Sequence, residues 1–110
     1  MRILFDQGTP VPLKGFLSAH EITTAHERGW GTLQNGDLLR TAEAAGFELI
    51  ITTDQNLRYQ QNLADRRLAI IVLRTTSWPV IRPHVARVAE AVGRAFIGSY
   101  EELTFPPHAH

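Results

Sequence analysis

Residues 49–54, Leu-Ile-Ile-Thr-Thr-Asp, are the stretch that decides the fold. They form an apolar run that ends at a carboxylate. Residues 69–73, Ala-Ile-Ile-Val-Leu, form a second run with no polar side chain. Short apolar runs of this kind predict strands that are covered on both faces, as the strands of a parallel sheet are. The sequence therefore predicts an α/β fold with helices on both sides of the sheet.

Weaker strands are expected on either side of these two. Residues 3–5, Ile-Leu-Phe, predict a buried strand that ends at Asp6, and residues 20–25 predict a β-rich segment. Residues 100–105 allow an edge strand. The whole pattern alternates strands with helices and predicts a three-layer α/β/α sandwich around a mainly parallel sheet of four to five strands.

The segments between the predicted strands contain residues that favour helices. Thr9 and Pro10 predict a helix start, with a capping hydroxyl and a proline in the first turn. A second helix is expected from Asn35 to Gly46, and a short one over residues 56–65. A long helix is expected over residues 81–96. Two apolar stripes should face the sheet: one of Leu13, Phe16 and Leu17, the other of Ile81, Val85, Val88, Val92 and Phe96.

Length and composition allow one domain with one core. The chain has 110 residues, no cysteine and a formal net charge of zero. Neutrality argues against a protein that coats nucleic acid by charge alone, although an enzyme can still grip a few nucleotides. No segment approaches the roughly 20 apolar residues that cross a bilayer, so a cytoplasmic protein without membrane contact is expected. The domain is expected over residues 1–98, followed by a tail, 99–110, whose end is disordered.

Two carboxylates stand where parallel strands are expected to end. Asp6 follows the first strand, and Asp54 follows the strand that ends in Thr53. In an open parallel sheet the site lies beyond the carboxyl ends of the strands, so both side chains should project into one crevice. Asp37, at a helix start, can point to the same end. Three carboxylates around one pocket suit Mg²⁺ or Mn²⁺, which prefer oxygen ligands.

Each acidic residue also has a structural interpretation. Asp37 can stabilise its helix through the helix dipole, an effect of about 0.3–1 kcal/mol. Asp54 can cap the helix that follows, and Asp6 can cap a turn before Pro10. Glu27, in the glycine-punctuated loop over residues 26–36, either lines the same pocket or faces solvent.

Three segments together resemble a known family. They are Ile-Leu-Phe-Asp at 3–6, Asn-Gly-Asp-Leu-Leu at 35–39 and Ile-Ile-Thr-Thr-Asp-Gln-Asn-Leu at 50–57. They look like the PIN-like domains of small bacterial proteins, which are predicted nucleases often regarded as toxins of toxin–antitoxin pairs. The resemblance covers roughly residues 1–95. It implies a metal-dependent endoribonuclease with RNA as substrate, Mg²⁺ or Mn²⁺ as cofactor, an antitoxin protein as a possible partner, and a homodimer.

The resemblance also assigns roles to individual residues. It implies that Asp6, Asp37 and Asp54 are the catalytic acids and the metal ligands, and that Thr53 holds a phosphate or orients Asp54. The chain departs from the family where relatives carry Asp-Glu-Asn after the first strand, because Gln7 and Gly8 follow Asp6.

A second departure follows Asp54. Relatives often carry a second acid two residues later, where this chain has Asn56. A neutral Asn can still bind metal or phosphate, but the site carries less negative charge. Arg58 and Tyr59 come soon after. Arg58 could contact a phosphate and Tyr59 could stack on a base, although for each residue taken alone a solvated helix face with a half-buried Tyr is the favoured interpretation.

Other classes of protein remain as alternatives. The first is a catalytically weak or inactive PIN-like module that binds a protein, which Gln7 and Asn56 favour. A receiver-like phosphotransfer domain would need paired acids after its first strand and a lysine after its last, and Lys14 is the only lysine. A haloacid-dehalogenase-type phosphatase needs Asp-x-Asp after the first strand, where Gly8 takes the place of the second acid.

Overall fold

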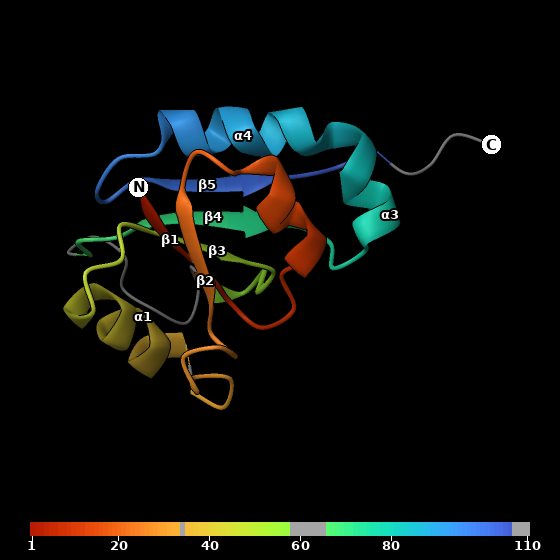
Figure 1. The fold of residues 1–110 in the computed structure, drawn as a ribbon. Coiled ribbons are helices and arrows are strands. Elements are labelled where there is room, and N and C mark those ends of the chain that lie inside the picture. The colour runs from red at the N-terminus through yellow and green to blue at the C-terminus, as the bar shows by residue number, and fades with distance from the viewer. Residues whose placement is uncertain (34, 58–65, 107–110) are drawn as a thin grey trace.

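The computed structural model describes residues 1–33, 35–57 and 66–106 (Figure 1). In this part of the chain one sheet contains five strands in the order β2-β1-β3-β4-β5, and every neighbouring pair is parallel. The predicted parallel sheet is therefore confirmed. The strands are β1 (Arg2–Phe5), β2 (Glu21–Thr24), β3 (Leu49–Thr52), β4 (Ala69–Leu73) and β5 (Tyr100–Leu103).

The two apolar runs form the central strands, because every residue of β3 and β4 is buried. Their side chains alternate between the two faces of the sheet, as the period of a strand requires. Ile51 and Ile71 belong to the hydrophobic cluster on one face of the sheet, and Ile50 and Ile70 belong to the cluster on the other face, so the core has a layer on each side of the sheet. Both faces of the sheet are thus packed against other elements, which explains why neither β3 nor β4 contains a charged residue.

Helices cover both faces of the sheet. The helix α1 (Asn35–Ala44) packs its Leu38, Leu39 and Ala42 on the face that carries Ile50. The 3₁₀ helix η1 (Val11–Phe16) and the helix α4 (Val85–Arg94) pack on the opposite face. Figure 1 shows α1 below the sheet and α4 above it.

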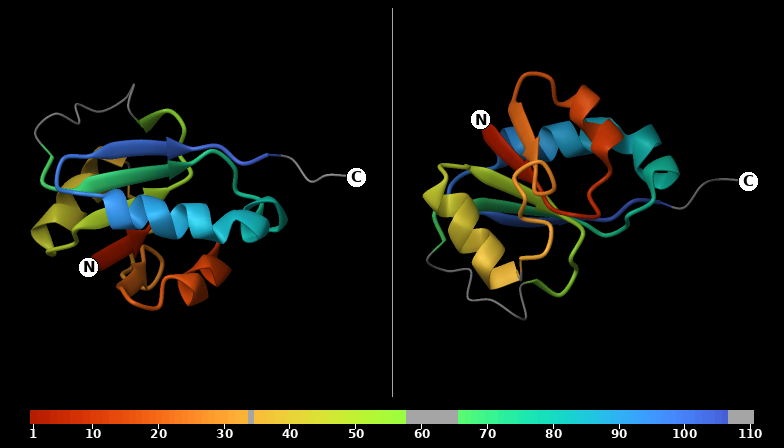
Figure 2. Two further views of the ribbon diagram at one scale, coloured as in Figure 1. Left: turned by 90° about the horizontal axis from the view of Figure 1, so that it is seen from above. Right: turned by 60° about the horizontal axis from the view of Figure 1, so that its bottom comes forward.

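The connection from β4 to β5 has the rare hand. The connection from β1 to β2, through η1, and the connection from β4 to β5, through α4, lie on the same face of the sheet. The first leads toward the β2 edge of the sheet and the second toward the β5 edge. The two crossovers therefore have opposite handedness. Connections of this type are right-handed in roughly 98% of cases, and here the one through α4 is left-handed (Figure 2). This path brings the segment after β4 beside η1, where the rings of Trp78 and Phe16 lie 5.7 Å apart.

The prediction of one long helix over residues 81–96 was wrong in its extent. Three shorter elements replace it: α3 (Trp78–Ile81), the 3₁₀ helix η2 (Arg82–His84) and α4. Pro79 and Pro83 each take an early helical position, where their missing N–H is tolerated, so each starts an element. Val88 and Val92 face the core as expected, whereas Phe96 follows the helix and is 68% exposed.

The first helix also differs from its prediction. Thr9 does not cap it, because its hydroxyl donates to the Ile51 carbonyl at 2.9 Å and Pro10 occupies the N-cap position. The element is a 3₁₀ helix with three residues per turn, so the stripe predicted from α-helical spacing is incomplete. Leu13 and Leu17 are buried, but Phe16 is 50% exposed.

The remaining expectations concern the ends of the chain and one internal segment. The edge strand expected within residues 100–105 is confirmed as β5. The helix expected over residues 56–65 falls mostly outside the described residues, as do residues 107–110 of the tail. Among the described helices, none has the length and apolar character that a membrane crossing requires.

Candidate functional site

Asp6 and Asp54 lie where the strand order reverses. The chain passes from β1 to β2 on one side of β1 and later returns to form β3 on its other side. Phe5 pairs with Ile51, so the two strands end side by side, with Asp6 and Asp54 just beyond them. Ligands of open α/β sheets bind in the crevice at such a switch point. The convergence predicted from strand patterning is therefore supported by the register of the sheet.

The hydroxyl of Thr52 connects the two acids. It donates to Asp6 Oδ2 at 2.7 Å and accepts the backbone N–H of Asp54 at 3.1 Å. The other oxygen of Asp6 accepts the backbone N–H of Gln7 at 2.7 Å. Thr52 is itself buried at the end of β3. The carboxylate of Asp6 is thus fixed through both oxygens, and a buried side chain sets its position relative to Asp54.

The environment of Asp6 raises the pKa of its carboxyl group. Burial is the largest cause, because it penalises the charged form. The hydrogen bonds from Thr52 and Gln7 oppose it, and the negative charge of Asp54 raises the pKa further. The two carboxylates are therefore close enough to repel each other, and a cation between them would remove that repulsion.

Asp54 also organises the turn that follows it. Its Oδ1 accepts the backbone N–H of Asn56 at 3.0 Å, and its carbonyl oxygen accepts that of Leu57 at 3.4 Å. Gln55 donates to the carbonyl of Arg74 at 3.0 Å and ties this turn to the end of β4. Asp54 thus holds this turn beside its place in the site, and the helix that it was expected to cap falls mostly outside the described residues. Asn56 is exposed and contributes its backbone N–H to this turn.

Thr53 lies against the backbone of the loop after β1. Gly8 has a φ of +95°, and a Cβ built on it would stand 2.9 Å from Thr53 Oγ1. A glycine is required here by both its left-handed conformation and the close approach. The sequence showed Gly8 only as a departure from the family, and its structural role was missed. The cue available in the sequence was a glycine three residues after a strand end.

Asp37 is not brought to the other two acids. Its side chain is 56% exposed and forms an ion pair with Arg40, one turn along α1. Among residues 1–33, 35–57 and 66–106, no three His, Cys, Asp or Glu side chains are grouped so that they could hold a metal ion. The structure therefore brings together two of the three predicted metal ligands.

Glu27 binds within its own loop. Its Oε1 accepts the backbone N–H of Thr24 at 3.1 Å, and its own N–H donates to the Thr24 hydroxyl at 3.0 Å. Lys14, from η1, lies 3.5 Å from the same carboxylate oxygen. The hydrogen bond from the Thr24 backbone is the main cause that lowers the pKa of Glu27. Glu27 thus holds the turn after β2.

A cavity of about 290 Å³ opens beside Asp6. It lies between the loop after β1 and the turn after β2, so the loop that was expected to bring Glu27 to the pocket brings His26 instead. The missed residues are mainly Gln7 and His26, whose spacing in the sequence gave no signal. The lining consists of Phe5, Asp6, Gln7, Gly8, Thr9, Val11, Thr24 and His26.

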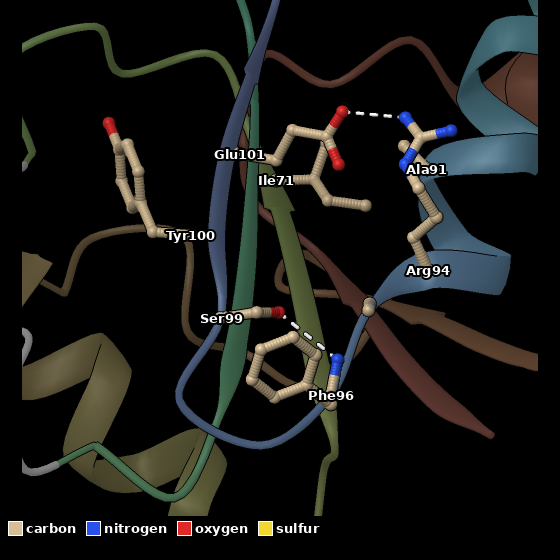
Figure 3. Close-up of a pocket in the computed structure, with 8 residues that line it drawn as sticks. Ile71, Ala91, Arg94, Phe96, Ser99, Tyr100 and Glu101 are labelled. Carbon is tan, nitrogen blue, oxygen red and sulfur yellow. Dashed lines mark hydrogen bonds and ion pairs between the residues drawn. The ribbon is translucent and has the colours of Figure 1, made fainter.

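A larger groove of about 650 Å³ lies elsewhere, where α4 ends and β5 begins (Figure 3). Arg94 and Glu101 form an ion pair across it at 2.6 Å, and the N–H of Phe96 donates to the Ser99 hydroxyl at 3.1 Å. The opposite charges neutralise each other, and none of the predicted site residues lines this groove. The Asp6 cavity is smaller, but it contains the carboxyl group with the raised pKa, and this makes it the better candidate site.

Arg58 and Tyr59, the predicted substrate contacts, lie outside the described residues. Asp6, Asp54, Thr52, Gln7 and the nearby cavity thus make up the candidate site that the structure describes. Comparison of the chain with protein-family models, with curated proteins and with solved structures gave no match.

Proposed function

We propose that this protein is a PIN-like, metal-dependent endoribonuclease with a three-layer α/β/α arrangement, and that Asp6 and Asp54 form its catalytic centre. One observation carries the proposal. The two acids lie at the switch point of a parallel sheet, and Thr52 holds the carboxylate of Asp6 beside the backbone of Asp54. The type of reaction is inferred from the sequence resemblance, and the proposed position of the catalytic centre is inferred from the geometry of Asp6 and Asp54.

The donor set suits a weakly held magnesium or manganese ion. Mg²⁺ is usually bound in proteins by one or two carboxylates, with water and substrate phosphates completing the shell. Asp6 and Asp54 provide two carboxylates, and the raised pKa of Asp6 reflects in part the charge of Asp54. Two acids would hold one ion, with RNA phosphate completing the coordination, so we expect metal and RNA to bind cooperatively.

The residues of the chain would share the work of hydrolysis. When bound, the metal ion stabilises negative charge on the phosphate and lowers the pKa of a water molecule. Asp6 and Asp54 would hold it, with Thr52 and the Gln7 backbone fixing the orientation of Asp6. Such preorganisation matters because a misplaced ligand weakens every contact to the reacting phosphate.

A second candidate function is a PIN-like module that binds a protein without cleaving RNA. The observation that favours it is the position of Asp37, which pairs with Arg40 and is exposed. With Asp37 outside the centre and with Gln7 and Asn56 replacing acids, the negative charge available for metal is low. In a toxin–antitoxin pair such a module would still bind its antitoxin partner, and a homodimer is compatible with either function.

RNA cleavage with and without metal distinguishes the two candidates. Purified protein should cleave single-stranded RNA in the presence of Mg²⁺ or Mn²⁺ and lose cleavage in EDTA. Asp6→Asn and Asp54→Asn should each abolish activity. The matched control is Glu21→Gln, because Glu21 is an exposed acid at the start of β2, at the other end of the sheet. Cleavage that survives the double variant Asp6→Asn, Asp54→Asn would contradict the proposal.

Calorimetry tests the alternative directly. The nuclease proposal expects Mn²⁺ to bind the wild-type protein and not the double variant. An absence of binding at millimolar metal, both with and without RNA, would favour the protein-binding module.

A further inference from the structure

The turn after β2 is held rigidly, and the reason lies in its own hydrogen bonds. Thr24 and Glu27 bond to each other twice, through the N–H of each and the side chain of the other. Lys14 adds a contact from η1, and Gly29 donates its N–H to the carbonyl of His26 at 3.0 Å. This arrangement fixes the backbone on both sides of His26. His26 is one of the residues that line the Asp6 cavity.

The opposite wall of the cavity is equally well fixed. The N–H of Thr9 donates to the carbonyl of Asp6 at 3.1 Å, which closes a turn over Gln7 and Gly8. The hydroxyl of Thr9 is buried and bonds to β3, so the turn is anchored to the centre of the sheet. Gly8 fits against Thr53 without room for a side chain. The cavity thus lies between two turns that hydrogen bonds hold in place.

The lining combines polar and apolar surface. Phe5 forms a buried floor, and Val11 presents an exposed aliphatic side chain from the start of η1. Gln7, Thr24 and His26 add an amide, a hydroxyl and an imidazole, groups that can both donate and accept hydrogen bonds. At about 290 Å³ the cavity is near the lower end of small-molecule sites, which suits one nucleoside unit.

We propose that this cavity binds the nucleoside next to the scissile phosphate, with His26 and Gln7 as the residues that contact it. The inference rests on the proposed nuclease function and deepens it. Asp6 belongs both to the catalytic centre and to the cavity wall, so a nucleoside seated there has its phosphate next to the acids. The base packs on Val11 and the imidazole ring, and Gln7 hydrogen-bonds its edge or its ribose. Glu27 is a positioning residue, since it acts through the turn that carries His26.

Steady-state kinetics on a short single-stranded RNA test the proposal. His26→Ala and Gln7→Ala should each raise KM about tenfold, the change expected when one contact of about 1.4 kcal/mol is lost. The value of kcat should change much less, because the acids stay in place. Glu90→Ala, on the exposed surface of α4, is the control and should leave both constants unchanged. Wild-type KM and an unchanged cleavage pattern in both His26→Ala and Gln7→Ala would overturn the inference while leaving the nuclease proposal intact.

A binding measurement separates this inference from catalysis altogether. Adenosine and uridine, which carry no phosphate, are titrated into metal-free protein while the imidazole resonances of His26 are followed by NMR. A saturable shift of His26, lost in Gln7→Ala, supports the cavity as a nucleoside site even if RNA cleavage fails. No shift of His26 with either nucleoside at tens of millimolar would overturn it. Glu27→Gln should weaken the same binding, and Glu90→Ala should not.

Discussion

The hydroxyl of Thr52, the last residue of β3, donates a hydrogen bond of 2.7 Å to Oδ2 of Asp6, the first residue after β1. The same oxygen accepts the N–H of Asp54. A single buried side chain therefore sets the distance between two acids that come from different strands.

Replacing Thr52 with valine removes the hydroxyl while keeping the shape of the side chain. The N–H of Asp54 and one oxygen of Asp6 then lose a partner in a partly buried place. We expect a loss of about 1–3 kcal/mol in the free energy of unfolding, the usual cost of an unsatisfied buried polar group. Urea denaturation measures it. RNA cleavage by Thr52→Val should fall as well, since Asp6 is no longer oriented.

Thr52→Ser is the matched control, because it restores the hydroxyl and loses only a methyl group. It should recover most of the activity that Thr52→Val loses. NMR titration adds a second readout: the pKa of Asp6 should rise further in Thr52→Val, because the hydrogen bond from Thr52 lowers it in the wild-type protein. Equal activity of the serine and valine variants would show that the hydroxyl does not position Asp6.

Asp6→Asn should change how stability depends on pH. The pKa of Asp6 in the folded protein lies above its ordinary value of 3.8, so between these two values the folded state binds more protons than the unfolded state. The contribution of Asp6 to the free energy of unfolding therefore falls as pH rises through that window. Asparagine lacks this term, so the stability of Asp6→Asn relative to wild type should increase from pH 3.5 to pH 7.

Chemical denaturation at several pH values, in EDTA, measures this difference. Glu21→Gln serves as the reference for the loss of one negative charge at an exposed position. If the stability of Asp6→Asn relative to wild type fell with rising pH, the carboxyl of Asp6 would be stabilised in its charged form, contrary to the effect of its burial.

The fold was predictable from the sequence where burial alone determines the structure. The apolar runs at 49–52 and 69–73 are buried throughout, and their short length beside turn residues favours a strand over a buried helix. The helix predictions were less accurate. Pro83 interrupts the segment expected as one helix, and a 3₁₀ geometry left Phe16 outside the predicted stripe. Local backbone geometry of this kind depends on contacts that a periodic pattern does not contain.

The candidate site was predictable only in part, for a related reason. Asp6 and Asp54 could be placed together because the carboxyl ends of parallel strands must meet at one edge of the sheet. Asp37 lies on a helix, where rotation of the side chain decides its partner, and it pairs with Arg40. Thr52, Gln7 and His26 depend on turn conformations and on which loops adjoin. The sequence therefore predicted the location of the site better than its full set of residues.

Metal binding should depend on Asp6 and Asp54 and much less on Asp37. Calorimetric titration of Mn²⁺ is expected to show no binding to Asp6→Asn or Asp54→Asn. Asp37→Asn should retain binding, since Asp37 is exposed and paired with Arg40. Its main effect should be a loss of about 0.3–1 kcal/mol in stability, because an acid in the first turn of α1 favours the helix dipole.

A different result would change the description of the centre. If Asp37→Asn abolished Mn²⁺ binding as completely as Asp54→Asn does, then Asp37 would leave Arg40 to join the metal, and the three-acid site expected from the sequence would be restored. Arg40→Gln distinguishes this case, because freeing Asp37 from its partner should then strengthen metal binding.

Gly8→Ala should be more destabilising than an alanine at another left-handed glycine. Its φ of +95° alone makes a Cβ unfavourable by on the order of 1–3 kcal/mol, and the new atom would stand 2.9 Å from Thr53 Oγ1. Gly29 is the matched control, since its φ is +74° and no atom lies within 4 Å of a Cβ there. Denaturation of both variants should show a larger loss for Gly8→Ala. The additional loss of stability in Gly8→Ala should disappear in the double variant Gly8→Ala, Thr53→Ala, because the second change removes the contacting oxygen. Equal losses in Gly8→Ala and Gly29→Ala would mean that the Thr53 side chain moves away from the new Cβ and that Gly8 is not held against Thr53.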